Sequence, residues 1–292
     1  MQNTVCNSQQ VWDQAAAAHE AILFQSYEWG KLMEELPETS FHPVILKTDN
    51  GQAVYVPVFE QNGNISGNMI GYGGPFLEGP ISFEWLQGEI KALFGREMSR
   101  MLLPYDQATF IEEFGPGWEV KTTHMLTLPD TFEELWTSCS GKARTAVRYA
   151  EKESVTIRQI GQKELNEFYD LYKAHSAAIG AQYVLRLSFF QRLLENLSSR
   201  VFWVGAFLEQ KLISSSIFLY DRSHFYYWQN VNSLDGKKAQ ASYLLMRDAL
   251  QFAINAKLRW ADFGYSHSKE IARPKRYWGA EEKRCLQFTA AE

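Results

Sequence analysis

The chain has 292 residues, of which 46% are hydrophobic and 14% are aromatic, and its formal net charge at pH 7 is −5. This length predicts two domains rather than one, and the hydrophobic content is sufficient for packed cores. A dedicated nucleic-acid-binding protein is usually basic overall, so the acidic balance argues against DNA as a partner. It leaves room for a local basic patch, because net charge conceals an uneven distribution.

The cysteines and the N-terminus limit the expected compartment and the expected metal chemistry. Cys6, Cys139 and Cys285 are far apart and odd in number, so they predict neither a disulfide framework nor a zinc site. The six histidines lack metal-ligand spacing as well, and we expect no metal. The N-terminus lacks the features of a signal peptide, and no segment approaches the ~20 apolar residues of a membrane span. The sequence therefore predicts a cytoplasmic protein that does not span a membrane.

The first half of the chain begins with a helix, a hairpin and a third strand. Ser26 is the predicted N-cap of the helix, which Pro37 ends. The turn at 49–51, Asp-Asn-Gly, joins two β-rich runs and is a strong hairpin signal. The expected elements are helices over 26–36, 83–94 and 106–114, and strands over 43–47, 53–59, 65–70, 101–103 and 119–128.

The second half repeats this order of elements. Gly180 is a predicted C-cap, and Ser188 with Gln191 has capping-box spacing. The expected elements are helices over 165–179, 188–197 and 239–256, and strands over 201–208, 212–220, 225–231 and 260–263. The repeat predicts an α+β (α/β mixed sheet) fold of two tandem acetyltransferase-like (GNAT) domains, at residues 1–130 and 131–292.

Three basic segments are candidates for binding phosphate. Residues 140–152 form a predicted amphipathic helix whose Arg144, Arg148 and Lys152 share one face. That face can hold a diphosphate or an RNA backbone, or it can simply be solvated. The loop at 232–238, which precedes a helix, is either an anion site or a solvated turn. The third segment, 269–276, follows His267, which is either a general base or an ordinary surface histidine.

Seven short motifs lie at 24–31, 72–76, 136–157, 189–192, 233–236, 261–264 and 275–279. In their order they resemble the Fem family of peptidoglycan-bridge aminoacyltransferases. The resemblance covers nearly the whole chain and implies a Fem-type pair of GNAT-like domains. It implies an acyltransferase that transfers an aminoacyl or acyl group to an amine of a cell-envelope precursor, in peptidoglycan or polysaccharide synthesis.

The resemblance also implies the substrates and their binding residues. The acyl donor, either aminoacyl-tRNA or acyl-CoA, is a co-substrate, and no tightly bound cofactor is expected. The acceptor is a small or lipid-linked precursor, and we expect a monomer. Where aminoacyl-transferring relatives carry tyrosines, this chain has Tyr-Trp at 227–228. The candidate catalytic residues are Tyr227, Trp228 and Asn230, and the candidate substrate-binding residues are Lys31, Arg144, Arg148, Arg186 and Lys275.

Two alternatives stay open at this point. The chain could be a binding protein that has the GNAT fold without the reaction, since a fold does not by itself imply a function. It could also be an acetyl-CoA-dependent N-acetyltransferase that acts on amino sugars. Turnover of a thioester or a charged tRNA would exclude the binding protein. Use of acetyl-CoA rather than charged tRNA would distinguish the N-acetyltransferase from an aminoacyltransferase.

Overall fold

The computed structural model describes residues 4–107, 111, 115–266 and 268–290. The chain forms two compact units, Met1–Thr122 with Arg284–Glu292, and Thr123–Lys283. It passes from the first unit to the second within β7 (Trp118–Thr127) and returns within β13 (Glu281–Thr289). These compact units do not test the predicted domain division at residue 130, which stays a prediction.

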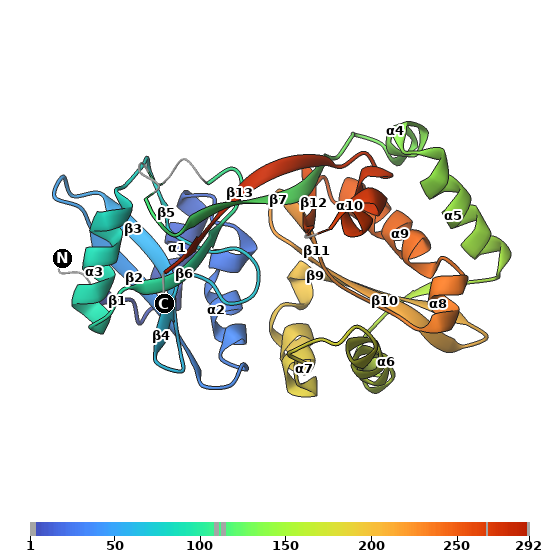
Figure 1. Cartoon of the computed structure of the whole chain (residues 1–292), viewed down its shortest axis with the longest axis horizontal. Coiled ribbons are helices and arrows are strands. Elements are labelled where there is room, and N and C mark those ends of the chain that lie inside the picture. Colours follow the sequence, from blue (N-terminus) through green and yellow to red (C-terminus); the bar gives the residue numbers. More distant parts are fainter. Residues whose placement is uncertain (1–3, 108–110, 112–114, 267, 291–292) are drawn as a thin grey trace. The chain divides into compact units, whose positions relative to one another are not determined.

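The remaining elements follow in chain order (Figure 1). Those of the first unit are β1 (Thr4–Val5), α1 (Gln9–Ala18), the 3₁₀ helix η1 (Leu23–Gln25), α2 (Tyr27–Met33), β2 (Thr39–Lys47), β3 (Ala53–Gln61), β4 (Asn64–Ser66), β5 (Phe76–Leu77), α3 (Phe83–Phe94) and β6 (Met98–Leu103). Those of the second unit are α4 (Phe132–Ser138), α5 (Gly141–Lys152), β8 (Thr156–Gln159), α6 (Leu165–Ala178), α7 (Leu187–Asn196), the 3₁₀ helix η3 (Ser198–Arg200), β9 (Val201–Leu208), β10 (Lys211–Tyr220), β11 (His224–Asn232), α8 (Leu234–Lys238), α9 (Ala241–Asn255), β12 (Trp260–Tyr265) and α10 (Lys269–Arg276).

The first unit has the predicted hairpin. Strands β2 and β3 pair antiparallel, and Lys47 and Ala53 form the pair next to the turn. The Asn-Gly turn therefore joins the two strands as predicted. The strand order in this unit is β1-β2-β3-β4-β6-β13, with β4 and β6 parallel and the other neighbouring pairs antiparallel. The side chain of Ser26 accepts a hydrogen bond from the backbone N–H of Trp29, which confirms the predicted N-cap.

The second unit repeats this pairing pattern. Its strand order is β7-β12-β11-β10-β9-β8, in which only β11 and β12 are parallel among the described pairs. Helix α9 packs on β9, β10 and β11, while α6 packs on β10 and β11, and Figure 1 shows the two helices on opposite faces of the sheet. The α+β class and the mixed sheet are therefore confirmed.

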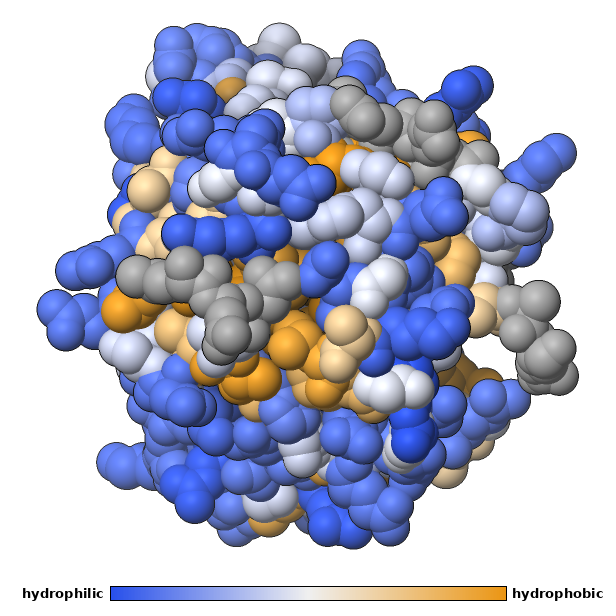
Figure 2. Space-filling view, turned by 90° about the vertical axis from the view of Figure 1, so that its left-hand side faces the viewer, coloured by the Kyte–Doolittle hydropathy of each residue, from blue (hydrophilic) through white to orange (hydrophobic). Residues whose placement is uncertain are grey.

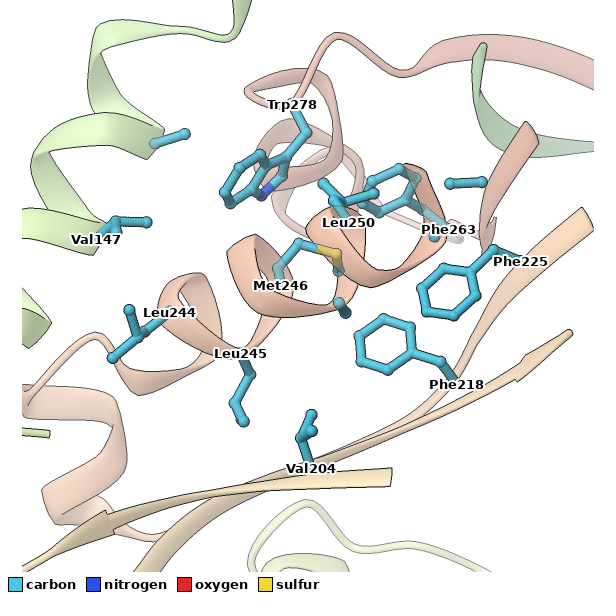
Figure 3. Packing of buried hydrophobic residues seen from close by; sticks show 14 of the residues in the cluster. Val147, Val204, Phe218, Phe225, Leu244, Leu245, Met246, Leu250, Phe263 and Trp278 are labelled. Atoms are coloured by element: carbon cyan, nitrogen blue, oxygen red, sulfur yellow. The ribbon is translucent and has the colours of Figure 1, made fainter. Parts of the chain in front are cut away.

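The core of the second unit lies between α9 and the sheet. Leu245 of α9 is fully buried on the side that faces Val204, and Leu250, also fully buried, lies beside Phe263 on the other side of the helix (Figure 3). The rings of Phe218 and Phe225 stack below α9 with centroids 4.9 Å apart. Replacing a buried Phe with Ala costs about 3–5 kcal/mol in proteins of known stability. This packing fixes the position of α9 over the strands that carry the candidate site.

Some local predictions need correction. The loop expected over 232–238 contains the short helix α8, and the basic cluster at 269–276 forms α10, with Ser268 as its N-cap. Helix α7 starts from Arg186 without a side-chain cap, so the predicted capping box at Ser188 is wrong. The helix expected over 106–114 falls largely outside the described residues.

The surface and the thiols carry little functional information. Figure 2 shows one face on which hydrophobic residues gather near the centre of a mostly hydrophilic surface. Apolar atoms contribute more than half of an ordinary protein surface, so this view assigns no partner.

Cys6, Cys139 and Cys285 are buried, and none of the three forms a disulfide. Among the helices described, none is both long and apolar enough to cross a bilayer.

Candidate acyl-transfer site

The two parallel strands of the second unit separate partway along their length. Strands β11 and β12 pair only between His224–Tyr226 and Trp260–Asp262, although they continue to Asn232 and Tyr265. Beyond Tyr226, the edge of β11 that faces β12 has no strand partner among the described residues. Backbone N–H groups on such an edge are available to an acyl carbonyl.

A β-bulge in β11 marks the same point. Tyr227 lies opposite Phe218 of β10 and Gln229 lies opposite Ile217, so Trp228 is the additional residue. A bulge shifts the alternation of side chains by one residue, and bulges occur often next to active sites. Tyr227 and Asn230 are three positions apart and would lie on opposite faces of a regular strand. Because of the shift, their side chains lie on the same face of the sheet.

A small pocket lies on this face, in the opening between β11, β12, α9 and α10. Its volume is about 80 Å³. Its polar lining comes from Ser242 and Lys275. Its apolar and aromatic walls come from Tyr227, Tyr243, Met246, Phe263, Pro274 and Trp278. The pocket therefore contains two of the predicted site residues, Tyr227 and Lys275.

Lys275 is a buried cation at this pocket. Its side chain extends from α10, and the residue is 8% exposed. Its Nζ donates hydrogen bonds to the backbone carbonyls of Gly264, at 2.7 Å, and Tyr265, at 2.9 Å. Burial lowers the pKa of Lys275 to about 8, and the nearby carboxylate of Asp262 opposes that change. The ammonium group therefore still carries its charge near neutral pH, although its pKa lies only about one pH unit higher.

Asp262 is itself tied to the end of β12. Its Oδ1 accepts hydrogen bonds from Thr123 Oγ1, at 2.5 Å, and from the backbone N–H of Gly264, at 2.7 Å. Gly264 has a φ of +76°, a conformation that suits glycine, and its carbonyl holds Lys275. Asp262 and Gly264 therefore orient the lysine together.

Tyr227 and Asn230 belong to a polar network beneath the pocket. The hydroxyl of Tyr227 is hydrogen-bonded to Ser216, and burial raises the pKa of this phenol, so it stays protonated. The amide Nδ2 of Asn230 donates to Ser216 Oγ at 2.8 Å, and its Oδ1 accepts from Asn232 Nδ2 at 2.6 Å. Ser242 Oγ donates to Asn232 Oδ1 at 3.0 Å and links the network to α9.

Trp228 lies on the other face of the sheet. Its ring packs 6.0 Å from Phe189 and 6.5 Å from Phe190, both on α7. Tyr227, by contrast, packs against Phe218 and Phe263 on the α9 side. The structure therefore does not bring Trp228 together with Tyr227, Asn230 and Lys275. A side chain on the α7 face can contact only a substrate that approaches from that side.

A basic groove lies at the N-terminus of α9, between α5 and α8. It is lined by Lys142, Tyr149, Lys238 and Gln240, together with smaller residues of α5, and its volume is about 560 Å³. The Nζ of Lys142 lies 5.3 Å above the ring of Tyr277. Two lysines and a helix N-terminus favour negatively charged groups. The sequence predicts basic segments at 140–152 and 232–238 separately, and the structure joins them in this groove.

The predicted arginines have different environments. The Nη1 atom of Arg144 donates to the carbonyls of Trp136, Thr137 and Cys139 at the C-terminal end of α4, at 3.0, 3.0 and 2.7 Å. A cation there stabilises the helix end. Arg148, on the same helix face, is exposed. The substrate role assigned to both arginines stays a prediction.

The last two predicted binding residues do not lie at the pocket. Arg186 is exposed at the start of α7. Lys31 is in the first unit, where it forms an ion pair with Glu34 on α2. Their substrate roles also stay predictions. His267 lies outside the described residues.

Sequence reasoning missed several residues of the site. Ser242, Tyr243 and Met246 belong to α9, whose helical pattern indicates burial but not which buried residues border an opening. His124 of β7 was missed as well. It is 1% exposed, its Nδ1 lies 3.2 Å from Ser266 Oγ, and burial and the charge of Lys275 lower its pKa. An isolated histidine in a strand gives no sequence signal of such an environment.

Comparison with known proteins identifies the fold. Residues 141–275 match the FemAB-like family, whose description is peptidoglycan biosynthesis and recognition. The solved structure of FemX aligns with 99% of this chain and 98% of its own, with a TM-score of 0.69 and 12% identity. No curated protein sequence matches the chain.

Two further solved structures share the arrangement over almost the whole chain. A tandem GNAT protein from the clavulanic acid pathway has a TM-score of 0.55 at 8% identity and covers 100% of this chain and 98% of its own. The L-PGS structure from Bacillus licheniformis has a TM-score of 0.60 at 9% identity, with 98% and 93% covered. The predicted Fem-type, tandem GNAT-like fold is confirmed.

Proposed function

We propose that this chain, whose fold is that of the Fem family with its GNAT-like domains, is an acyltransferase that forms an amide on a cell-envelope precursor. The observation that carries the proposal is the pocket at the opening between β11 and β12, with Lys275 and Tyr227 in its lining. The match of residues 141–275 to the FemAB-like family supports an acceptor from peptidoglycan synthesis. The structural likeness to FemX and to L-PGS supports transfer of an aminoacyl group.

In the proposed reaction, the acceptor amine attacks the carbonyl carbon of the activated acyl group. A C–N bond forms, and the C–O bond of an ester or the C–S bond of a thioester breaks. The amine loses a proton, and the leaving hydroxyl or thiol gains one. The enzyme's contribution is to position both substrates and to stabilise the negative charge that develops on the carbonyl oxygen.

Lys275 is the residue best suited to stabilise that charge. An ammonium group has three N–H donors, and two of them have backbone carbonyl partners among the described residues. The third can donate to the carbonyl oxygen in the pocket, together with a backbone N–H of β11 beyond Tyr226. Tyr227 stays protonated, so its hydroxyl is a candidate hydrogen-bond donor to the leaving group, although its raised pKa makes it a weak acid.

The groove between α5 and α8 is suited to the phosphates of the donor. Both candidate donors, aminoacyl-tRNA and acyl-CoA, carry phosphates at a distance from the reacting carbonyl. Lys142 and Lys238 line the groove, and exposed Arg148 lies on the same helix as Lys142. Several phosphate contacts to tRNA make binding fall steeply with salt, whereas the few phosphates of CoA give a weaker dependence. Salt titration of donor binding therefore distinguishes the two.

The proposal is tested by measuring amide formation from a panel of charged tRNAs and acyl-CoA thioesters with envelope-precursor amines. We expect Lys275→Met to lower kcat by about 10²–10³-fold, as loss of one oxyanion donor does elsewhere. Lys211→Met is the matched control, because Lys211 is an exposed lysine of the same unit that pairs with Asp235. Donor binding without any turnover would leave the chain as a binding protein with this fold.

A further inference from the structure

A buried histidine lies beside the end of β12. His124 is 1% exposed and belongs to β7, which pairs antiparallel with β12. The pairs on either side of it are Met125 with Asp262 and Thr123 with Tyr265, and the register shifts between them. His124 therefore lies next to the irregular end of β12, where the strand regularity is lost.

A hydrogen bond joins this histidine to the strand end. Its Nδ1 lies 3.2 Å from Ser266 Oγ. Ser266 directly follows Tyr265, and the backbone carbonyls of Gly264 and Tyr265 accept hydrogen bonds from the Nζ of Lys275. Because planar peptide units connect these residues, a contact that fixes Ser266 also restrains the carbonyl of Tyr265. The histidine therefore reaches the lysine through one short backbone segment.

Packing alone does not account for a histidine at this position. The Nε2 of His124 is buried and has no hydrogen-bond partner among the described residues. Oε1 of Glu282 lies 3.8 Å away, which is beyond hydrogen-bond distance, and Glu282 forms an ion pair with Arg276. A buried polar atom without a partner costs free energy relative to an apolar side chain of similar shape. What the histidine contributes is the contact made by its other nitrogen.

Burial and the neighbouring cations keep His124 neutral. Lys275 and Arg276 of α10 act on it together with Asp262 of β12 and Glu282 of β13. Burial has the largest effect and lowers the pKa of His124, the two cations lower it further, and the two carboxylates oppose them. A neutral imidazole places no second cation beside the desolvated ammonium of Lys275. His124 can therefore hold the strand end without weakening the charge of the lysine.

We propose that His124 and Ser266 form a positioning pair, which holds the end of β12 and thereby orients Lys275 for acyl transfer. This inference rests on the proposed function, because the pair acts through the lysine that stabilises the developing negative charge. Neither residue lines the pocket, so neither is placed to bind the donor. The pair should therefore influence kcat and leave the KM for the donor unchanged.

The first test is a double-mutant cycle on the full chain. Ser266→Ala removes the hydrogen bond, and we expect it to lower kcat for amide formation by about fivefold or more. In a Lys275→Met background the same change should alter kcat by less than about twofold, because residues that act as a unit are not additive. Equal losses with and without the lysine overturn the inference, and so does an unchanged kcat in Ser266→Ala alone.

The chain offers a matched control for this cycle. Ser223 Oγ lies 2.9 Å from the Nδ1 of His224, which is 5% exposed and belongs to the same unit. Neither residue lines the pocket. Ser223→Ala removes a histidine–serine contact of the same kind and should leave kcat unchanged. A loss equal to that of Ser266→Ala would show a general effect on the fold and would overturn the inference.

Variants of the histidine separate the contact from the volume of the ring. His124→Asn places an amide near the position of Nδ1, can keep the contact with Ser266, and should retain kcat to within about threefold. His124→Leu fills the space without the contact and should reproduce the loss seen with Ser266→Ala. Equal kcat values for the two histidine variants overturn the inference. Should His124→Leu not fold, Ser266→Ala still decides.

A measurement without substrate separates this inference from the proposed function. A carbonyl that accepts from the ammonium of Lys275 favours its charged form, so a displaced Tyr265 carbonyl should lower the pKa of the lysine further. In urea denaturation, the rise of stability with pH, measured relative to Lys275→Met in the same background, should begin at least about half a pH unit lower in Ser266→Ala. An unchanged onset overturns the inference whether or not amide forms. A shifted onset without any amide formation removes the proposed function and leaves the positioning of the lysine intact.

Discussion

Lys275 gives the sharpest prediction, because its burial links the pH to the stability of the fold. Unfolded lysine has a pKa near 10.4, whereas burial lowers the pKa of Lys275 to about 8 in the folded chain. Between these pH values the unfolded state binds the additional proton, so the free energy of unfolding rises with pH. The full difference corresponds to about 3 kcal/mol, at 1.36 kcal/mol for each pH unit. Below pH 8 both states are protonated, and the cost of burying the charge is fully present.

The perturbation is Lys275→Met, which removes this titration and keeps most of the side-chain volume. We expect the stability of the unmodified chain, relative to the variant, to increase by about 3 kcal/mol between pH 7 and pH 10.5. Urea denaturation at several pH values, followed by tryptophan fluorescence, measures that difference. Titrations common to both proteins cancel in the comparison.

The exposed lysine Lys211 is the control, since its side chain is 69% exposed. Lys211→Met should not reproduce the rise in relative stability that Lys275→Met is expected to give. If the difference between Lys275→Met and the unmodified chain is independent of pH, the lysine is not desolvated. That result would refute the argument that burial lowers the pKa of Lys275.

Three further predictions follow from the contacts around the site. Arg144→Met removes hydrogen bonds to three carbonyls at the end of α4, and urea titration should show a loss of stability of about 1–3 kcal/mol. Arg148 is exposed, so Arg148→Ala should leave stability unchanged and should raise the KM for the donor. Asp262→Asn removes the charge that raises the pKa of Lys275, so the loss of activity at alkaline pH, seen in a kcat profile, should move to lower pH. Gly236→Ala would bring a Cβ within 2.2 Å of a backbone carbonyl, at Ile213, and should lower stability by about 1–3 kcal/mol in the same titration.

Much of the fold could be predicted because its signals are local. The two-residue turn between β9 and β10 has Glu209 and Gln210 at positive φ, and the expected strands on either side pair as a hairpin. Helix α3 has the predicted bounds, since Ser82 caps its start and Gly95 ends it in the left-handed conformation. Helix α10 was not predicted, because its Pro274 and its many charged residues resemble a loop.

The candidate site was only partly predictable. Tyr227 and Lys275 were chosen from family resemblance, and the structure brings them to one pocket although 48 positions separate them along the chain. The resemblance also predicts Trp228 at the donor, but a strand sends adjacent side chains to opposite faces. The bulge that aligns Asn230 with Tyr227 depends on the register with β10, which no local pattern encodes.

A crystal structure with a non-transferable donor analogue tests the central claim most directly. Suitable analogues are a CoA thioether with a small acyl-like group, or an adenosine that carries an amide-linked aminoacyl group. We predict that the acyl carbonyl lies between β11 and β12 on the α9 side, with its oxygen about 3 Å from the Nζ of Lys275. An analogue bound elsewhere, with its carbonyl away from this opening, would contradict the proposed acyl-transfer site.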